Sequence, residues 1–186
     1  MILQRLREET RAAHDAIERD LEAFGAQRSL DRHRLLVARF FGFYAAWEPQ
    51  VASSLADEPF FSPRRKLPLL EQDLEFLGYD RAMIEALPRC SNPPGLTSLP
   101  ETLGSLYVLE GSTLGGQVIA HRLERSLGLS DGRGYAYFRS YGREVGAMWR
   151  AFGVRLCALP AAAGDASVRS AQLTFARLHT WLCDGV

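Results

Sequence analysis

Several features are scarce in this 186-residue chain, and each absence excludes a class of protein. It has only three cysteines, Cys90, Cys157 and Cys183, none in a CxxC metal or redox motif, so we expect reduced packing thiols in a reducing compartment. Its 22 basic and 22 acidic residues cancel, which leaves no global field to attract nucleic acid or anionic lipid. No apolar run approaches the roughly 18 residues that span a bilayer, and the N-terminus lacks a secretory apolar core. We expect a cytoplasmic protein that binds neither nucleic acid nor membrane.

Strand signals are also missing. Apolar and polar residues nowhere alternate over a sustained stretch, and the hairpin-like dipeptide Asp131-Gly132 has flanks that do not alternate. Apolar residues recur every three to four positions instead, which is typical of amphipathic helices. The sequence therefore predicts an all-α fold, and the length and the 47% hydrophobic content predict one domain over residues 1–186.

The periodicity and the turn residues place the expected helices. Ser29 and Asp80 are predicted N-caps, Gly25, Gly78 and Gly128 are predicted helix ends, and Pro49 is expected to bend the helix that contains it. The predicted helices cover residues 2–24, 30–55, 69–77, 81–87, 100–127, 140–159 and 166–183.

A line of polar residues follows one face of the first predicted helix. Arg7, Thr10, His14 and Glu18 are spaced three, four and four residues apart. A metal-binding histidine usually donates its second ring N–H to a carboxylate, and a glutamate four residues away can accept it. A solvated face with an ordinary His–Glu pair is the other interpretation, and the local pattern leaves both open.

Four glycines interrupt the helical pattern of residues 103–127. Gly104, Gly111 and Gly115 share a narrow stripe, and Gly116 follows directly. A glycine inside a helix costs about 0.5–1 kcal/mol relative to alanine, so the missing side chains need a reason. Either the bare backbone approaches a flat ligand, or it lies against another helix. The segment lacks GxGxxG and GK[ST], which excludes a nucleotide-binding loop.

The remaining charged and histidine residues carry weaker signals. His33 is interpreted as a solvated residue and His179 as a packing or surface residue, and a substrate-side role for His121 stays open. No histidine follows a glutamate by three residues, which argues against a di-iron carboxylate bundle. The basic run at residues 64–66 is interpreted as a solvated loop that an electron-donating partner could use.

Two segments together resemble the signature segments of haem oxygenases: residues 9–18 (ETRAAHDAIE) and residues 106–119 (LYVLEGSTLGGQVI). The likeness covers nearly the whole chain, is weakest over residues 57–98, and is greatest to the bacterial enzymes that supply biliverdin to bacteriophytochromes. It implies haem held between the N-terminal proximal helix and a glycine-kinked distal helix. It further implies cleavage of haem to biliverdin, CO and ferrous iron with O2, using electrons from a ferredoxin or a flavoprotein reductase.

The resemblance also implies roles for particular residues. His14 corresponds to the axial iron ligand, Glu18 to the carboxylate on its other ring nitrogen, and Thr10 belongs to the same haem-binding face. Arg7 and Arg150 correspond to cations that pair with the haem propionates. The matching distal-helix positions are Gly111, Ser112, Gly115 and Gly116.

Ser112 departs from the family pattern, because many members have aspartate directly after the first distal glycine. A hydroxyl can hold a water but supplies no charge. Either another group anchors the distal water, with Thr113, Gln117 and His121 as candidates, or the protein is a haem carrier or sensor without efficient turnover. A helical bundle of the thiaminase type, which binds no haem, is a third hypothesis from fold analogy.

Overall fold

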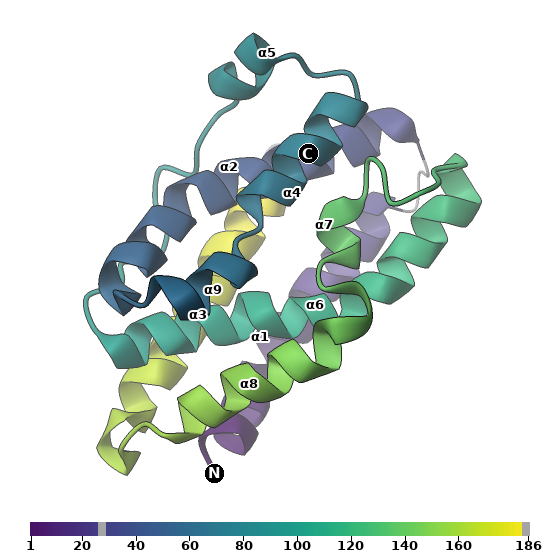
Figure 1. Ribbon diagram of the computed structural model, residues 1–186. Helices are drawn as coiled ribbons and strands as arrows, with labels where there is room; N and C mark the ends of the chain where they lie inside the picture. The colour runs from purple at the N-terminus through teal and green to yellow at the C-terminus, as the bar shows by residue number, and fades with distance from the viewer. Residues whose placement is uncertain (26–28, 184–186) are drawn as a thin grey trace.

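The computed structural model describes residues 1–25 and 29–183, and all regular secondary structure in these residues is helical (Figure 1). This confirms the predicted all-α class. The five long helices are α1 (Ile2–Gly25), α2 (Leu30–Leu55), α6 (Leu99–Leu127), α8 (Val145–Cys157) and α9 (Gly164–Cys183). The shorter helices are α3 (Glu58–Phe61), α4 (Leu67–Phe76), α5 (Arg81–Ala86) and α7 (Ala136–Arg139), with 3-10 turns at Ser62–Arg64, Gly142–Glu144 and Ala161–Ala163.

The predicted helix ends follow from cap chemistry. The hydroxyl of Ser29 accepts the N–H of Arg32 at 3.2 Å, and the carboxylate of Asp80 accepts the N–H of Met83 at 2.8 Å. Gly128 ends α6 with a φ of 67°, a left-handed conformation that suits glycine. These boundaries are confirmed.

One predicted helix was wrong in extent, and two short helices were not predicted. The helix expected from residue 140 begins at Val145 instead, because Ser140 has a φ of 43°, which a right-handed helix cannot contain, and a 3-10 turn follows it. The short helices α3 and α7 were not predicted, since four residues give too few positions for a helical period to be read.

Helix α9 is the element on which the other long helices assemble. It packs along both α1 and α6. Gly104 of α6 lies directly on α9, where an added Cβ would overlap the carbonyl oxygen of Ser167. The hydroxyls of Ser167 and Ser170 donate to the carbonyls of Pro100 and Glu101 at 2.9 and 2.7 Å. Close helix packing therefore explains Gly104.

Helices α1 and α9 run parallel and in register. Arg5 pairs with Asp165 at 2.7 Å near the start of both helices. Further along, the side chain of Gln172 donates to the carbonyl of Glu9, and near the ends His179 meets Asp20 at 2.7 Å. The C-terminal ends of the two helices consequently lie together.

Helix α7 is held on α4 by a buried carboxylate. The two oxygens of Asp73 accept the backbone N–H groups of Ala136 and Tyr137 at 2.7 and 2.9 Å, and the residue is fully buried. Burial raises the pKa of Asp73 to about 6, while these hydrogen bonds act in the opposite direction. Asp73 thereby fixes α7 beside α6, which α7 also contacts.

Replacing Asp73 with asparagine should lower the free energy of unfolding by about 1–3 kcal/mol, because the amide NH2 that takes the place of one carboxylate oxygen cannot accept a hydrogen bond from a buried N–H. Urea denaturation at pH 7.5, where the wild-type carboxylate is ionised, measures the difference. Glu75→Gln, at an exposed position of the same helix, is the control. Equal stability of the two variants would contradict this role for Asp73.

Candidate functional site

The polar face of α1 is largely open to solvent. Arg7 and Glu18 are exposed, and the His14 side chain is 49% exposed with Nε2 3.5 Å from the nearer Glu18 oxygen. The His14 ring meets the Phe175 ring of α9 edge-on at a centroid distance of 6.0 Å. Thr10 differs from the others, since it is buried and its hydroxyl donates to the carbonyl of Leu6 at 2.7 Å.

A second exposed face lies on α6, and it is apolar. Gly111, Leu114, Gly115 and Val118 follow one another at helical spacing, and Leu114 and Val118 are 46% and 57% exposed. A Cβ at Gly115 would meet nothing within 4 Å, and one at Gly111 would meet only the Trp149 ring at 3.8 Å. Exposed apolar surface of this kind marks a binding face.

The faces of α1 and α6 are joined at both ends. At one end the Tyr107 hydroxyl interacts with Thr10, and at the other Arg122 pairs with Glu22 at 3.2 Å. Thr10 and Glu22 are twelve residues apart, which is about 18 Å along a helix. His14 on α1 and Gly111 and Gly115 on α6 lie between these two bridges, where the helices make scarcely any direct contact.

Aromatic side chains gather at the end of the site where Tyr107 lies near Thr10. The Tyr107 and Trp149 rings are 5.8 Å apart, and Trp149 lies 5.5 Å from Phe152. Burial raises the pKa of Tyr107, while Thr10 and the charge of Arg7 lower it. Arg150 follows Trp149 and is exposed. Both predicted propionate partners, Arg7 and Arg150, therefore lie near this end.

The structure separates the distal glycines by role. Gly116 is buried, and a Cβ there would overlap the carbonyl oxygen of Phe138 in α7. Gly116 is thus required by helix packing, as Gly104 is, whereas Gly115 faces open space and Gly111 has room for a Cβ in ordinary contact with the Trp149 ring. Helix α6 keeps its helical assignment throughout and bends along its course (Figure 1).

Ser112 belongs to a chain of hydroxyl groups that the sequence did not reveal. Its hydroxyl donates to the carbonyl of Leu109 at 2.8 Å and lies close enough to Tyr137 to lower the pKa of that residue, whose hydroxyl is 3.2 Å from that of Tyr44. Tyr44 and Tyr137 are buried. Tyr137 is 25 residues beyond Ser112, on the unpredicted α7, so no spacing rule could have indicated it.

The three groups expected to replace the distal aspartate are engaged elsewhere. The Thr113 hydroxyl donates to the carbonyl of Glu110, and the Gln117 amide donates to that of Arg139 at 2.9 Å. The His121 side chain is 69% exposed and lies 3.5 Å from Glu124. Tyr137 is the group that the structure places beside Ser112.

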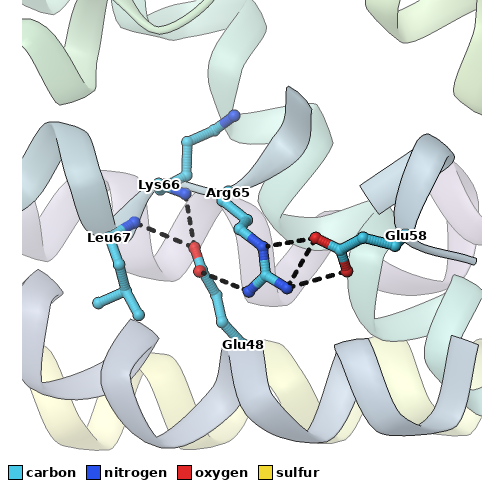
Figure 2. Close-up of polar contacts among 5 residues, drawn as sticks. All are labelled: Glu48, Glu58, Arg65, Lys66 and Leu67. Carbon is cyan, nitrogen blue, oxygen red and sulfur yellow. Dashed lines mark hydrogen bonds and ion pairs between the residues drawn. The ribbon is translucent and has the colours of Figure 1, made fainter. Parts of the chain in front are cut away.

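The basic run at residues 64–66 was predicted to be a solvated loop, and this was wrong. Arg64 and Lys66 are 5% and 3% exposed. Figure 2 shows the contacts of Arg65 and Lys66. The buried carboxylate of Glu48 accepts the backbone N–H groups of Lys66 and Leu67, and Arg65 forms ion pairs with both Glu48 and Glu58. Glu48 therefore places negative charge at the N-terminus of α4, which favours it.

Buried polar contacts of Glu110 with Tyr141 and Arg64 also hold α6 in place. The Tyr141 hydroxyl donates to the buried carboxylate of Glu110, whose other oxygen is 3.5 Å from Arg64. The Lys66 ammonium lies 3.7 Å from the centre of the Tyr141 ring. Burial raises the pKa of Glu110 and lowers that of Lys66 to about 8. These contacts hold the helix turn that precedes Gly111.

The fold and these faces define a class of protein. A half-exposed histidine on one helix and an exposed apolar face with glycines on another, within an all-α chain, fit a flat macrocycle whose metal takes an imidazole ligand. The open space at Gly115 and the apolar surface of Leu114 and Val118 suit haem. This is the arrangement of a helical haem-binding protein.

The chain belongs to the haem oxygenase family. The family model described as "Heme oxygenase" matches residues 1–184. A protein of Xanthomonas campestris pv. campestris named "Heme oxygenase" is 35% identical over 158 residues, which cover 82% of this chain and 86% of that protein.

Solved structures share the fold. The haem oxygenase of Leptospira interrogans superposes with a TM-score of 0.77 at 13% identity, covering 98% of each chain. Haem oxygenase-1 of the cyanobacterium Synechocystis, solved in complex with haem, gives a TM-score of 0.75 at 22% identity, covering 97% of this chain and 90% of that one. These neighbours confirm the predicted haem oxygenase-like bundle.

The adjacent glycines offer a matched test of the open face. Gly115→Ala should keep or raise the stability of the haem-free protein, since alanine favours the helix by about 0.5–1 kcal/mol, yet weaken haem binding by filling the open space. Gly116→Ala should instead destabilise the haem-free protein by about 1–3 kcal/mol through overlap with Phe138. Thermal unfolding and haem titration measure both effects, and destabilisation by Gly115→Ala would contradict the assignment.

Proposed function

We propose that this protein binds haem between α1 and α6 and cleaves it with O2 to biliverdin, CO and ferrous iron. The observation that carries the proposal is a pair of exposed surfaces, His14 on α1 and the glycine-containing face at Gly111 and Gly115 on α6, on two helices that come near each other at Thr10 with Tyr107 and at Glu22 with Arg122. Bound haem supplies the O2-binding iron and is itself the ring that is opened.

The proposed haem contacts are those of the polar α1 face and the aromatic end. His14 would supply one ring nitrogen to the haem iron, and Glu18, which lies 3.5 Å from Nε2 of this ring, would hold the other ring nitrogen and fix its tautomer. Arg7 and Arg150 hold the propionates as charge-assisted pairs. Thr10, buried beside Tyr107, closes the end of the haem site.

On the distal side the chain positions water through hydroxyl groups. The Tyr137 and Tyr44 hydroxyls are hydrogen-bonded, Ser112 on the α6 surface is near enough to lower the pKa of Tyr137, and hydroxyls both donate and accept protons. We propose that these hydroxyl groups hold the water that delivers protons, in place of the aspartate that many family members carry. Bare glycines at 111 and 115 keep other polar side chains away from the haem face.

The proposed setting is bacterial and cytoplasmic, with a ferredoxin or a flavoprotein reductase as electron donor and a bacteriophytochrome as the recipient of biliverdin. No helix among the described residues is both long and apolar enough to cross a bilayer.

The second candidate function is a haem carrier or sensor, which the presence of Ser112 in place of aspartate favours. Turnover of the wild-type haem complex with reductant in air distinguishes the two: a stable Soret band with a competent donor would establish the carrier.

His14→Ala should abolish turnover and change the ferric Soret spectrum, because the iron loses its protein ligand. His121→Ala is the control, since His121 is exposed on α6 and pairs only with Glu124. Haem titration and the rate of biliverdin formation measure both variants. A His14→Ala protein with wild-type spectrum and rate would refute the assignment.

Tyr137→Phe should leave haem affinity unchanged and lower the rate of biliverdin formation by about tenfold or more, since one hydroxyl is removed from the proposed proton route. It should also shift the pH at which the water bound to ferric haem ionises, as seen in the absorption spectrum. Tyr135→Phe, whose hydroxyl binds Glu124 instead, is the matched control. Identical rates and spectra for the two variants would contradict the route.

A further inference from the structure

A separate group of metal-ligating side chains lies where α1 and α9 end. Asp20 of α1 and His179 and Cys183 of α9 each place one ligand atom within 4.8 Å of the others. The His179 Nε2 is 2.7 Å from an Asp20 oxygen, and these side chains are 33% and 46% exposed. The group is therefore reachable from solvent, and it includes no residue of the haem site.

The spacing of the three residues suits a single metal ion. His179 and Cys183 are four residues apart on one helix, so both project from the same face of α9. A zinc ion binds thiolate at about 2.3 Å and imidazole or carboxylate at about 2.0–2.2 Å, which puts tetrahedral ligands about 3.3–3.7 Å apart. Small side-chain rotations within the observed 4.8 Å limit meet this requirement.

The backbone favours positive charge at the same place. Helices α1 and α9 run parallel, so the partial negative charges of both C-terminal ends meet there. Neither helix has a basic residue in its last turn. The end of α9 already attracts a cation from α2, because Arg39 donates to the carbonyl of Trp181 at 2.8 Å. The negative charge at the two helix ends is present whatever the positions of the three ligand atoms.

We propose that Asp20, His179 and Cys183 bind a divalent transition-metal ion of the zinc type, with water at the fourth position. Aspartate, imidazole and thiolate together select such ions over magnesium and calcium, which prefer oxygen ligands. The metal joins the C-terminal ends of α1 and α9. Phe175, which supports the His14 ring, lies one turn before His179, so the metal braces the helix that carries His14.

Cobalt(II) titration of the reduced, haem-free full-length protein tests the site without interference from haem absorption. We expect one equivalent to bind with a thiolate-to-cobalt charge-transfer band and the intense visible bands of tetrahedral cobalt. Zinc should displace it and raise the melting temperature of the protein. Cys183→Ser should remove the charge-transfer band, and His179→Ala and Asp20→Asn should each weaken binding at least about tenfold.

Cys157→Ser and His121→Ala are the matched controls, because both residues are exposed and lie outside the cluster. Both variants should keep the wild-type cobalt spectrum and affinity. No charge-transfer band in the wild type, or a band that persists in Cys183→Ser, would overturn the proposal. Haem binding by His14 is measured separately, so either proposal can fail while the other stands.

Discussion

The packing of α1 and α6 on the same helix, α9, is the constraint on which the proposed site depends. Each of the two helices packs along α9, and among the described residues α1 and α6 come near each other at Tyr107 with Thr10 and at Arg122 with Glu22. Because both helices are held by α9, they need little contact with each other, and the proposed haem position lies between them.

Holding α6 in this position requires buried polar groups on its other faces. Glu110 binds Tyr141 and approaches Arg64, while Asp73 holds the helix whose Phe138 carbonyl lies against Gly116. Buried charges are costly unless they are paired and hydrogen-bonded, so they contribute little net stability. Their directional contacts fix the rotation of α6, and with it the direction in which Gly111 and Gly115 face.

The glycines of α6 show why a residue pattern alone leaves a role open. Gly104 and Gly116 are needed because neighbouring carbonyl oxygens occupy the space of a Cβ, whereas Gly115 borders open space and Gly111 has room for a Cβ beside Trp149. The sequence spacing allowed both interpretations for each glycine. Packing and ligand access impose the same requirement, a missing side chain, and only the neighbouring helices distinguish them.

The sequence by itself determined the helical class, the caps at Ser29 and Asp80, the end of α6 at Gly128 and the two family segments, because these depend on local periodicity, local hydrogen bonds and residue identity. Tertiary structure alone decided which glycines face open space, that Tyr137 lies beside Ser112, that Arg64 and Lys66 are buried, and that Asp20 meets His179 and Cys183. Each of these joins segments far apart in the chain. Their contacts depend on how whole helices pack, which no short stretch of residues encodes.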